Sequence, residues 1–158
     1  MPKLSEDMKE LIERQRLGFV ATVCPDGTPN LSPKGTVCVL DEEHLIFADI
    51  RSPGTVSNLR TNPSVELNVV DHFVRKGYRF KGTARVLDAG AEFLRHLAFF
   101  SDRGMLDAPS RIRAIVILRV DRARALISPG YDRIADEASM RAYWLKHYVG
   151  DVGETGAV

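Results

Sequence analysis

Residues 29–49, PNLSPKGTVCVLDEEHLIFAD, constrain the fold of this chain more than any other stretch. Two runs rich in β-branched and aromatic residues flank Asp41-Glu42-Glu43, which predicts two strands joined by a turn. The first run is interrupted by Ser32-Pro33-Lys34-Gly35, where a proline and a glycine remove ladder hydrogen bonds and weaken a regular strand. Such a break is typical of a β-bulge or of a place where a ligand approaches the backbone, and Lys34 puts a positive charge there. These residues alone leave both interpretations open.

The surrounding segments extend this pattern into an antiparallel sheet. The apolar and alternating runs predict strands over residues 18–24, 29–40, 44–50, 65–71, 75–87 and 112–120. Turn chemistry at Pro25-Asp26-Gly27 and the acidic turn at 41–43 predict that the first three strands form a meander. The last strand is apolar almost throughout, as expected for a strand buried on both faces.

Helical spacing of apolar residues predicts four helices around this sheet, at residues 5–16, 52–61, 90–101 and 136–149. Ser5 and Ser52 are suitable N-caps, and Pro53 occupies the first helical position after Ser52. A length of 158 residues fits a single domain, which we place at residues 1–149, with a mobile Gly-rich tail at 150–158. The predicted fold class is α+β, dominated by an antiparallel sheet that closes into a small barrel.

The charge and cysteine content limit the possible partners and location. The chain carries 22 Lys and Arg against 21 Asp and Glu, a net charge of +1, so no broad basic surface for nucleic acid or an anionic membrane is expected. The charged N-terminus contains no signal peptide or membrane span. Cys24 and Cys38 have neither metal-binding nor disulfide-scaffold spacing, and both are expected to pack as small apolar residues in strands. These features predict a cytoplasmic protein.

The helix start at Ser52–Thr55 has the chemistry of a phosphate site, because its free N–H groups, its hydroxyls and the adjacent Arg51 all favour an anion. Simple helix capping is the alternative. The preceding strand ends beside this helix, and its predicted hairpin partner carries Ser32, Lys34 and Thr36. A phosphorylated ligand could therefore reach both elements.

A second basic feature is the face of strand 75–87 that carries Arg79, Lys81 and Arg85. This face could complete a phosphate site within one chain or across a dimer interface. A solvated strand face is the alternative, because antiparallel sheets commonly leave one face in water.

Other kinds of site find little support. The four histidines have no metal-ligand spacing, so no metal site is predicted. Hydrolase, metalloprotease, Walker and dinucleotide motifs do not occur. Tyr143, Trp144 and Tyr148 recur at helical spacing, which predicts a face that docks the last helix onto the domain.

The ordered segments GFVATVCPDGTPNLSPKGTV, LDEEHLIFAD, GTVSNLRTNPSVELNVVD and GYRFKGTARVL resemble the pyridoxamine 5′-phosphate oxidase-like flavin-binding proteins from Gly18 to Leu87. The resemblance implies a split β-barrel homodimer with FMN bound at the subunit interface. It implies that residues 34–37 line the flavin, and that positions on the next strand, the short helix and the later basic strand complete the site. With Ser32 and Arg51, the predicted cofactor-binding residues are Ser32, Lys34, Gly35, Thr36, Val37, Ala48, Asp49, Arg51, Thr55, Asn58, Arg79 and Lys81.

Two departures from the oxidases themselves point to the small flavin-nucleotide-binding members. Gly54-Thr55 stand where the oxidases have an arginine-lysine pair, and the segment SPGYDRIADEASMRAYWLKHY lacks their C-terminal substrate motif. We therefore expect an FMN-dependent oxidoreductase that passes hydride or electrons to or from a small molecule, with most of the chemistry supplied by the cofactor. No catalytic residue is assigned. The alternatives are a non-catalytic protein that stores or senses flavin, a deazaflavin-dependent reductase and, less favoured, a haem-handling protein.

Overall fold

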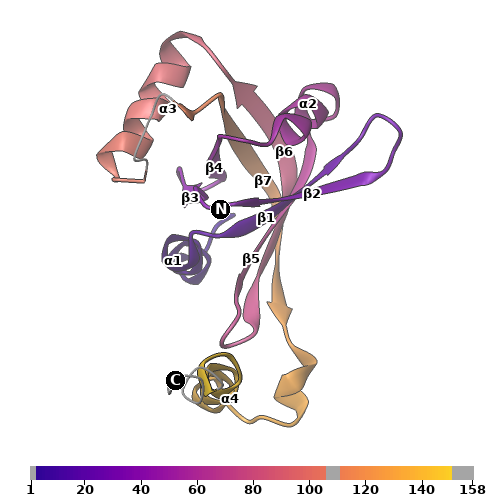
Figure 1. The fold of residues 1–158 in the computed structure, drawn as a ribbon, viewed down its shortest axis with the longest axis vertical. Coiled ribbons are helices and arrows are strands. Elements are labelled where there is room, and N and C mark those ends of the chain that lie inside the picture. Colours follow the sequence, from indigo (N-terminus) through magenta and orange to yellow (C-terminus); the bar gives the residue numbers. More distant parts are fainter. Residues whose placement is uncertain (1–2, 106–110, 151–158) are drawn as a thin grey trace, which may run out of the picture.

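Seven antiparallel strands form one curled sheet in the computed structural model, which describes residues 3–105 and 111–150 (Figure 1). The strands are β1 (Gly18–Val23), β2 (Pro29–Lys34), β3 (Cys38–Val39), β4 (His44–Asp49), β5 (Ser64–Asp71), β6 (Lys76–Leu87) and β7 (Ala114–Ile127). The helices are α1 (Glu6–Gln15), α2 (Pro53–Thr61), α3 (Gly90–Asp102), the 3-10 helix η2 (Pro129–Asp132) and α4 (Glu137–Val149). These elements confirm the predicted α+β class.

The order of strands across the sheet is β2-β1-β5-β6-β7-β4-β3, and each neighbouring pair is antiparallel. The predicted strand 29–40 divides into β2, which pairs with β1, and β3, which pairs with β4, so both predicted pairings occur. The predicted continuous meander does not form, because β2 lies at one end of this order and β3 and β4 lie at the other. Residues 35–37, which follow the Pro-Lys-Gly break, carry the chain from one end to the other. Thr36 bonds to the backbone of Ala48 where the two edges approach, but no ladder joins β2 to β4. The sheet is therefore a split barrel.

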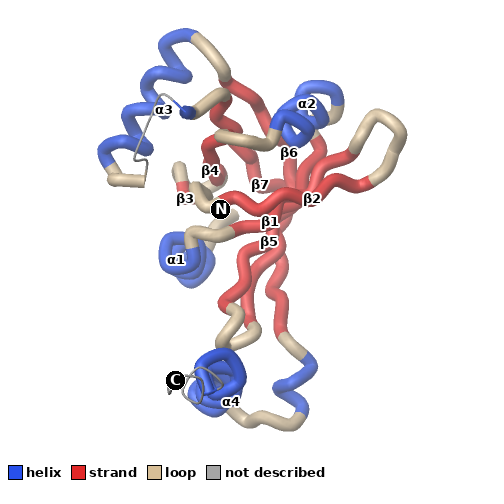
Figure 2. Tube along the Cα trace, in the orientation of Figure 1, coloured by secondary structure: helices blue, strands red, loops and turns tan. Residues whose placement is uncertain are grey.

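The strand β7 is longer than predicted. It continues through Ile127 because its second half pairs with β6, from Lys81↔Arg122 to Lys76↔Ile127. A register shift at Lys81/Gly82 marks a bulge between the two halves. Together β5, β6 and β7 extend beyond the barrel, and α4 lies at the far end of this extension (Figures 1 and 2).

Two apolar clusters hold the fold together. The first fills the barrel, where Val20, Phe47 and Phe80 are among the side chains that pack with Ile12 of α1. The second lies between the β4–β7 side of the sheet and α3 and includes the fully buried Phe100. Because each cluster joins strands that are distant in sequence, burial of apolar area fixes the curl of the sheet.

The last helix docks through fewer residues than predicted. Met140 of α4 is buried, and the Trp144 ring lies 3.5 Å from the guanidinium carbon of Arg75, a cation–π contact. Tyr148 accepts a hydrogen bond from Arg75 at 3.0 Å but remains 46% exposed, and Tyr143 is 60% exposed. Of the three predicted aromatic residues, Trp144 and Tyr148 therefore contact the β5–β6 end of the domain, where Tyr148 also lies against His72 and Phe73, and Tyr143 remains exposed.

Some smaller predictions have different outcomes. Cys38 is buried in β3 as expected, whereas Cys24 lies beyond the end of β1 and is half-buried; both are free thiols. Ser5 occupies the N-cap of α1, but its hydroxyl bonds to the Asp7 carboxylate and caps no backbone N–H.

The predicted mobile tail lies outside the described residues from position 151 onward. Across residues 3–105 and 111–150, no helix has the length and apolar character needed to span a bilayer.

Candidate functional site

Lys34, the last residue of β2, is a buried cation with little compensation. Its side chain is 5% exposed, and its Nζ donates hydrogen bonds to Ser32 Oγ and, at 3.3 Å, to the Pro33 carbonyl oxygen. Among the residues that the structure describes, no carboxylate oxygen lies within 4 Å of this Nζ. Burial lowers the pKa of Lys34, and the charge of Asp49 opposes that shift. An anion bound nearby would stabilise the charged form of this amine.

The segment from Gly35 to Val37 is fixed against the end of β4. The Thr36 hydroxyl donates to the Ala48 carbonyl oxygen at 3.1 Å and accepts from the Ala48 N–H at 2.9 Å. Val37 and Ala48 are buried, whereas a Cβ added at Gly35 would find no heavy atom within 4 Å. The segment is thus anchored on one side and open at its glycine.

Asp49 organises the turn between β4 and α2. Its buried carboxylate accepts hydrogen bonds from the Ser52 N–H at 2.9 Å and from the Ser52 hydroxyl. Ser52 is the N-cap residue, as predicted, but its hydroxyl donates to Asp49 and does not accept from the helix. Because no side chain caps α2, and Gly54 is open around its Cβ position, the first turn of α2 retains the free donors and positive dipole end that favour an anion.

Thr55 and Asn58 face the sheet. Asn30 donates from Nδ2 to Thr55 Oγ1 at 3.2 Å, and Asn58 donates from Nδ2 to Thr22 Oγ1 at 3.1 Å. This polar cluster seats α2 on β1 and β2, so both predicted residues position the helix. Sequence reasoning missed Thr22, which shares the inward side of β1 with Gly18 and Val20, and Asn30, which shares a side of β2 with Ser32 and Lys34.

The structure brings some of the predicted cofactor-binding residues together and places Arg79 and Lys81 in a separate region of the chain. Ser32, residues 34–37, Ala48, Asp49 and the start of α2 are linked by the contacts above. Arg51 is exposed beside them. Arg79 and Lys81 instead pair with Glu66 of β5, at 2.9 and 3.5 Å, and line a separate small cavity with Arg122 and Arg124.

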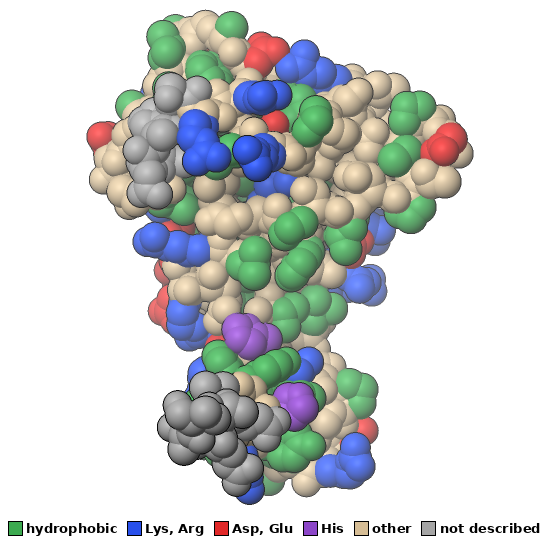
Figure 3. Space-filling model, in the orientation of Figure 1, with side chains coloured by type: hydrophobic (Ala, Val, Ile, Leu, Met, Phe, Trp, Pro, Cys, Tyr) green, Lys and Arg blue, Asp and Glu red, His purple; other side chains and the backbone are tan. Residues whose placement is uncertain are grey.

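The space-filling view agrees with an anion-binding character near β4 and α2. Figure 3 shows lysine and arginine side chains gathered over the region that β4 and the start of α2 occupy in Figure 1. A cavity of about 270 Å³ lies against α2, with Asp49, Pro53 and Arg113 in its lining. We call the region formed by residues 34–37, Ala48, Asp49 and the first turn of α2 the Lys34 site.

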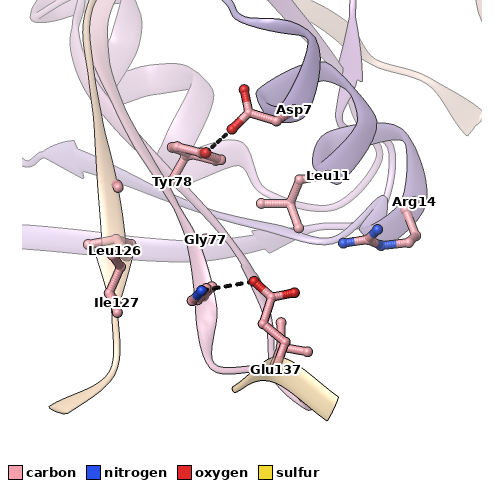
Figure 4. A pocket seen from close by; sticks show the side chains of 11 residues that line it. Asp7, Leu11, Arg14, Gly77, Tyr78, Leu126, Ile127 and Glu137 are labelled. Carbon is pink, nitrogen blue, oxygen red and sulfur yellow. Dashed lines mark hydrogen bonds and ion pairs between the residues drawn. The ribbon is translucent and has the colours of Figure 1, made fainter. Parts of the chain in front are cut away.

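A larger cavity, of about 300 Å³, lies between α1, the ends of β6 and β7, and α4 (Figure 4). Its polar groups are already paired, since Tyr78 donates to Asp7 and Lys76 donates to Glu137 at 2.8 Å. The hydrogen bond to Asp7 is the main cause that raises the pKa of Tyr78 to about 12, which keeps the phenol protonated. This cavity therefore lacks the unpaired convergent groups of a binding site.

The prediction that the histidines bind no metal remains a prediction. In the described parts of the chain, the structure contains no cluster of three or more His, Cys, Asp or Glu side chains that could hold a metal ion. His44 lies beside the Asp41 carboxylate at 2.8 Å, an ordinary surface contact.

Comparison with known families identifies the class of the protein. A family model described as pyridoxamine 5′-phosphate oxidase matches residues 4–125, more than half of the chain. The chain therefore belongs to the pyridoxamine 5′-phosphate oxidase-like family of split-barrel proteins. This result confirms the family resemblance drawn from residues 18–87.

Individual relatives are moderately similar. The uncharacterized protein MJ0282 of Methanocaldococcus jannaschii is 34% identical over 95 residues, which cover 59% of this chain and 62% of that protein. The chain thus spans less than two thirds of the length of this relative. The crystal structure of HupZ from Group A Streptococcus is 32% identical with a TM-score of 0.69, covering 79% of this chain and 95% of HupZ. A candidate pyridoxamine 5′-phosphate oxidase from Lactobacillus delbrueckii is 26% identical with a TM-score of 0.66, covering 78% and 95%.

More distant structures share the fold alone. They include an FMN-binding protein from Syntrophomonas wolfei, 15% identical with a TM-score of 0.63, which covers 76% of this chain and 84% of that one. They also include the haem storage protein HutZ from Vibrio cholerae, 20% identical with a TM-score of 0.63, and an F420 reductase, 23% identical with a TM-score of 0.60. Because these proteins are named for different ligands, the fold by itself does not identify the cofactor of this chain.

Proposed function

We propose that this chain binds FMN at the Lys34 site, as a homodimer, and passes hydride or electrons between FMN and a small molecule. The observation that carries the proposal is the buried Lys34 ammonium, which has no ion pair among the described residues. The uncapped start of α2, which follows β4 through Asp49 and Ser52, adds free N–H donors. An anionic cofactor would stabilise the Lys34 charge and accept hydrogen bonds from the helix N–H groups. Membership in the family and the fold shared with an FMN-binding protein support the same ligand.

The residues of the Lys34 site fit such a cofactor in distinct ways. Lys34 would hold negative charge, the open backbone at Gly35 would approach the ligand closely, and Thr36 would keep that backbone in place. When bound, FMN supplies the hydride and electron chemistry, for which no protein base is needed. A preorganised cation in a partly dry site favours negative charge on whatever it contacts.

The homodimer is supported by an apolar outer face. Figure 3 shows hydrophobic side chains across the middle of the molecule, over β1, β2 and β5. Among the large apolar side chains of these strands, Phe19, Leu31 and Val70 are exposed, and strand pairing puts all three on the same face of the sheet. The helix α4 carries the exposed Tyr143 and Leu145. A group of exposed apolar side chains on one sheet face favours association more than scattered surface residues do. A second copy of the chain is the occupant that we propose, with the flavin at the interface.

The test is an absorbance spectrum of the purified protein followed by titration with FMN. We expect flavin bands or saturable binding of one FMN per chain, and light scattering should give the mass of a dimer. No flavin bands and no binding with FMN on the order of tens of micromolar, an affinity weaker than about −6 kcal/mol, would contradict the proposal.

A non-catalytic role in storing or sensing flavin is the second candidate. It is favoured by one observation: the polar side chains around Lys34, such as Thr36 and Asp49, are already hydrogen-bonded, and none of them is placed as a free base. Tight stoichiometric FMN that NADH and NADPH do not reduce would favour this role over catalysis. Comparing the affinities for FMN and for a deazaflavin tests the reductase alternative, and a Soret band on haem titration would support haem handling.

A further inference from the structure

Four basic side chains meet on the outer face of the β6–β7 extension. Arg79 and Lys81 of β6 lie directly opposite Arg124 and Arg122 of β7, respectively. These four residues, which we call the basic quartet, form the whole lining of a cavity of about 140 Å³. The quartet lies on one side of the β-bulge at Lys81/Gly82, so the register of the two strands fixes its arrangement.

The charge of the quartet is poorly balanced. Like charges directly opposite each other on paired strands destabilise a sheet. Glu66 of β5 contacts Arg79 and Lys81, but Arg122 and Arg124 have no carboxylate oxygen within 4 Å in the described residues. One carboxylate therefore faces four cations, in a chain whose net charge is only +1.

Two other outward-facing arginines of the same strands are paired. Arg85 of β6 makes two contacts of 2.6 Å with Glu92, and Arg119 of β7 lies 3.3 Å from Asp121. A generally solvated basic face does not account for this difference. The uncompensated charge is concentrated where the side chains surround a hollow.

The chemistry and size of the hollow indicate its ligand. Guanidinium groups bind oxyanions through paired N–H donors, and arginine is a favoured residue for the recognition of phosphate. The hollow is smaller than the roughly 300–1,000 Å³ of pockets that enclose whole small molecules. It therefore suits one phosphate or diphosphate group, with the rest of any ligand outside.

We propose that the basic quartet is a second anion site, which binds the phosphate or diphosphate group of a small ligand other than the flavin. Its lining shares no residue with the Lys34 site or with the cavity beside α2. The inference does not depend on flavin binding, and the two can fail separately. Free phosphate and a phosphate ester would use the same donors.

The test compares the wild-type protein with an Arg122→Gln/Arg124→Gln double variant. Any protein that binds FMN is saturated with FMN before the anion is added. Inorganic phosphate, pyrophosphate and ribose 5-phosphate are titrated by calorimetry at low chloride, because salt screens exposed charges. Arg119→Gln is the matched control, since it removes an exposed arginine of the same strand that already has a carboxylate partner. FMN affinity is measured for every variant.

We expect pyrophosphate to bind the wild type and the control equally, and the double variant at least about tenfold more weakly, because two charge-assisted contacts are lost. Without added anion, the double variant should melt at the same or a higher temperature, since repulsion is relieved. Tighter binding of ribose 5-phosphate than of phosphate would identify an ester as the ligand, and the reverse order would identify the free anion.

Three outcomes would overturn the inference. The first is that none of the three anions binds the wild type, and the second is that the double variant binds them equally well. The third is that FMN affinity falls in the double variant in parallel with anion affinity, which would make the quartet part of the flavin site.

Discussion

Two regions of the molecule use glycine in opposite ways. A Cβ added at Gly82 of β6 would lie 1.8 Å from the carbonyl oxygen of Arg119, and one at Gly77 would lie 2.1 Å from that of Val69. At Gly35 and Gly54 of the Lys34 site, nothing lies within 4 Å of the added atom. The β6 glycines are required by the close approach of a neighbouring strand, whereas those of the Lys34 site leave space. Substitutions should therefore affect stability in the first region and ligand binding in the second.

The largest effect is expected for Gly82→Ala. The new methyl group cannot fit at 1.8 Å from a backbone oxygen, so β6 and β7 must separate at the bulge. We expect the free energy of unfolding, measured by urea denaturation of the FMN-free protein, to fall by about 3 kcal/mol or more. A urea midpoint equal to that of the wild type would contradict this prediction, because it would mean that β6 and β7 separate at the bulge with no loss of stability.

The second largest effect is expected on FMN binding at the Lys34 site. Lys34→Met keeps the apolar stem of the side chain and removes its charge, so we expect FMN to bind about 10- to 100-fold more weakly, the range for loss of one charge-assisted contact. Stability of the FMN-free protein should stay equal or rise, because a buried charge is removed. Lys76→Met, at an exposed lysine paired with Glu137, is the control and should leave affinity unchanged. Wild-type affinity in Lys34→Met would remove this lysine from the flavin site.

The pH dependence of stability provides an independent measure of Lys34. Burial lowers the pKa of its amine in the folded state below the ordinary value of 10.5. In the window between the lowered pKa and 10.5, the unfolded chain holds a proton that the folded chain has lost, so the free energy of unfolding rises with pH. We expect the wild type to gain stability relative to Lys34→Met as pH increases through this window, in urea titrations without FMN. A constant difference would mean that the amine is not desolvated.

Local residue patterns predicted most elements of both regions. Alternation of apolar residues located β1, β4, β5 and β6 to within a residue or so, and Asn62-Pro63 ended α2 as expected. The second half of β7 was missed because Arg122 and Arg124 alternate with alanines, which give a weak apolar signal. The basic quartet depends on that half-strand, so its full membership could not be read from the sequence.

Strand pairing and side-chain direction were harder to predict. The two predicted hairpin pairings formed, but strand 29–40 is not continuous, because the three residues after Lys34 cross between the edges of the sheet. A sequence pattern does not record which strands meet across a barrel. Ser52 occupies the N-cap as predicted, but its hydroxyl donates to the Asp49 carboxylate at the end of β4 and accepts no hydrogen bond from the helix. Thr55 and Asn58 sit on α2 as predicted, but the cluster with Thr22 and Asn30 decides that they face the sheet.

The smallest effect is expected for Gly54→Ala, which tests whether the ligand contacts the first turn of α2. Gly54 lies in the first turn of α2 with a negative φ and open space around its Cβ position, so Gly54→Ala should preserve or raise stability by up to about 1 kcal/mol. If the flavin phosphate rests on this turn, the added methyl group should still weaken FMN binding a few-fold, while Thr61→Ala at the other end of α2 should not. FMN affinity is measured by titration and stability by urea denaturation. An unchanged affinity in Gly54→Ala, together with a loss in Lys34→Met, would place the anion at the lysine and away from the helix start. The open glycine at position 35 would then be the only one of the two that the ligand uses.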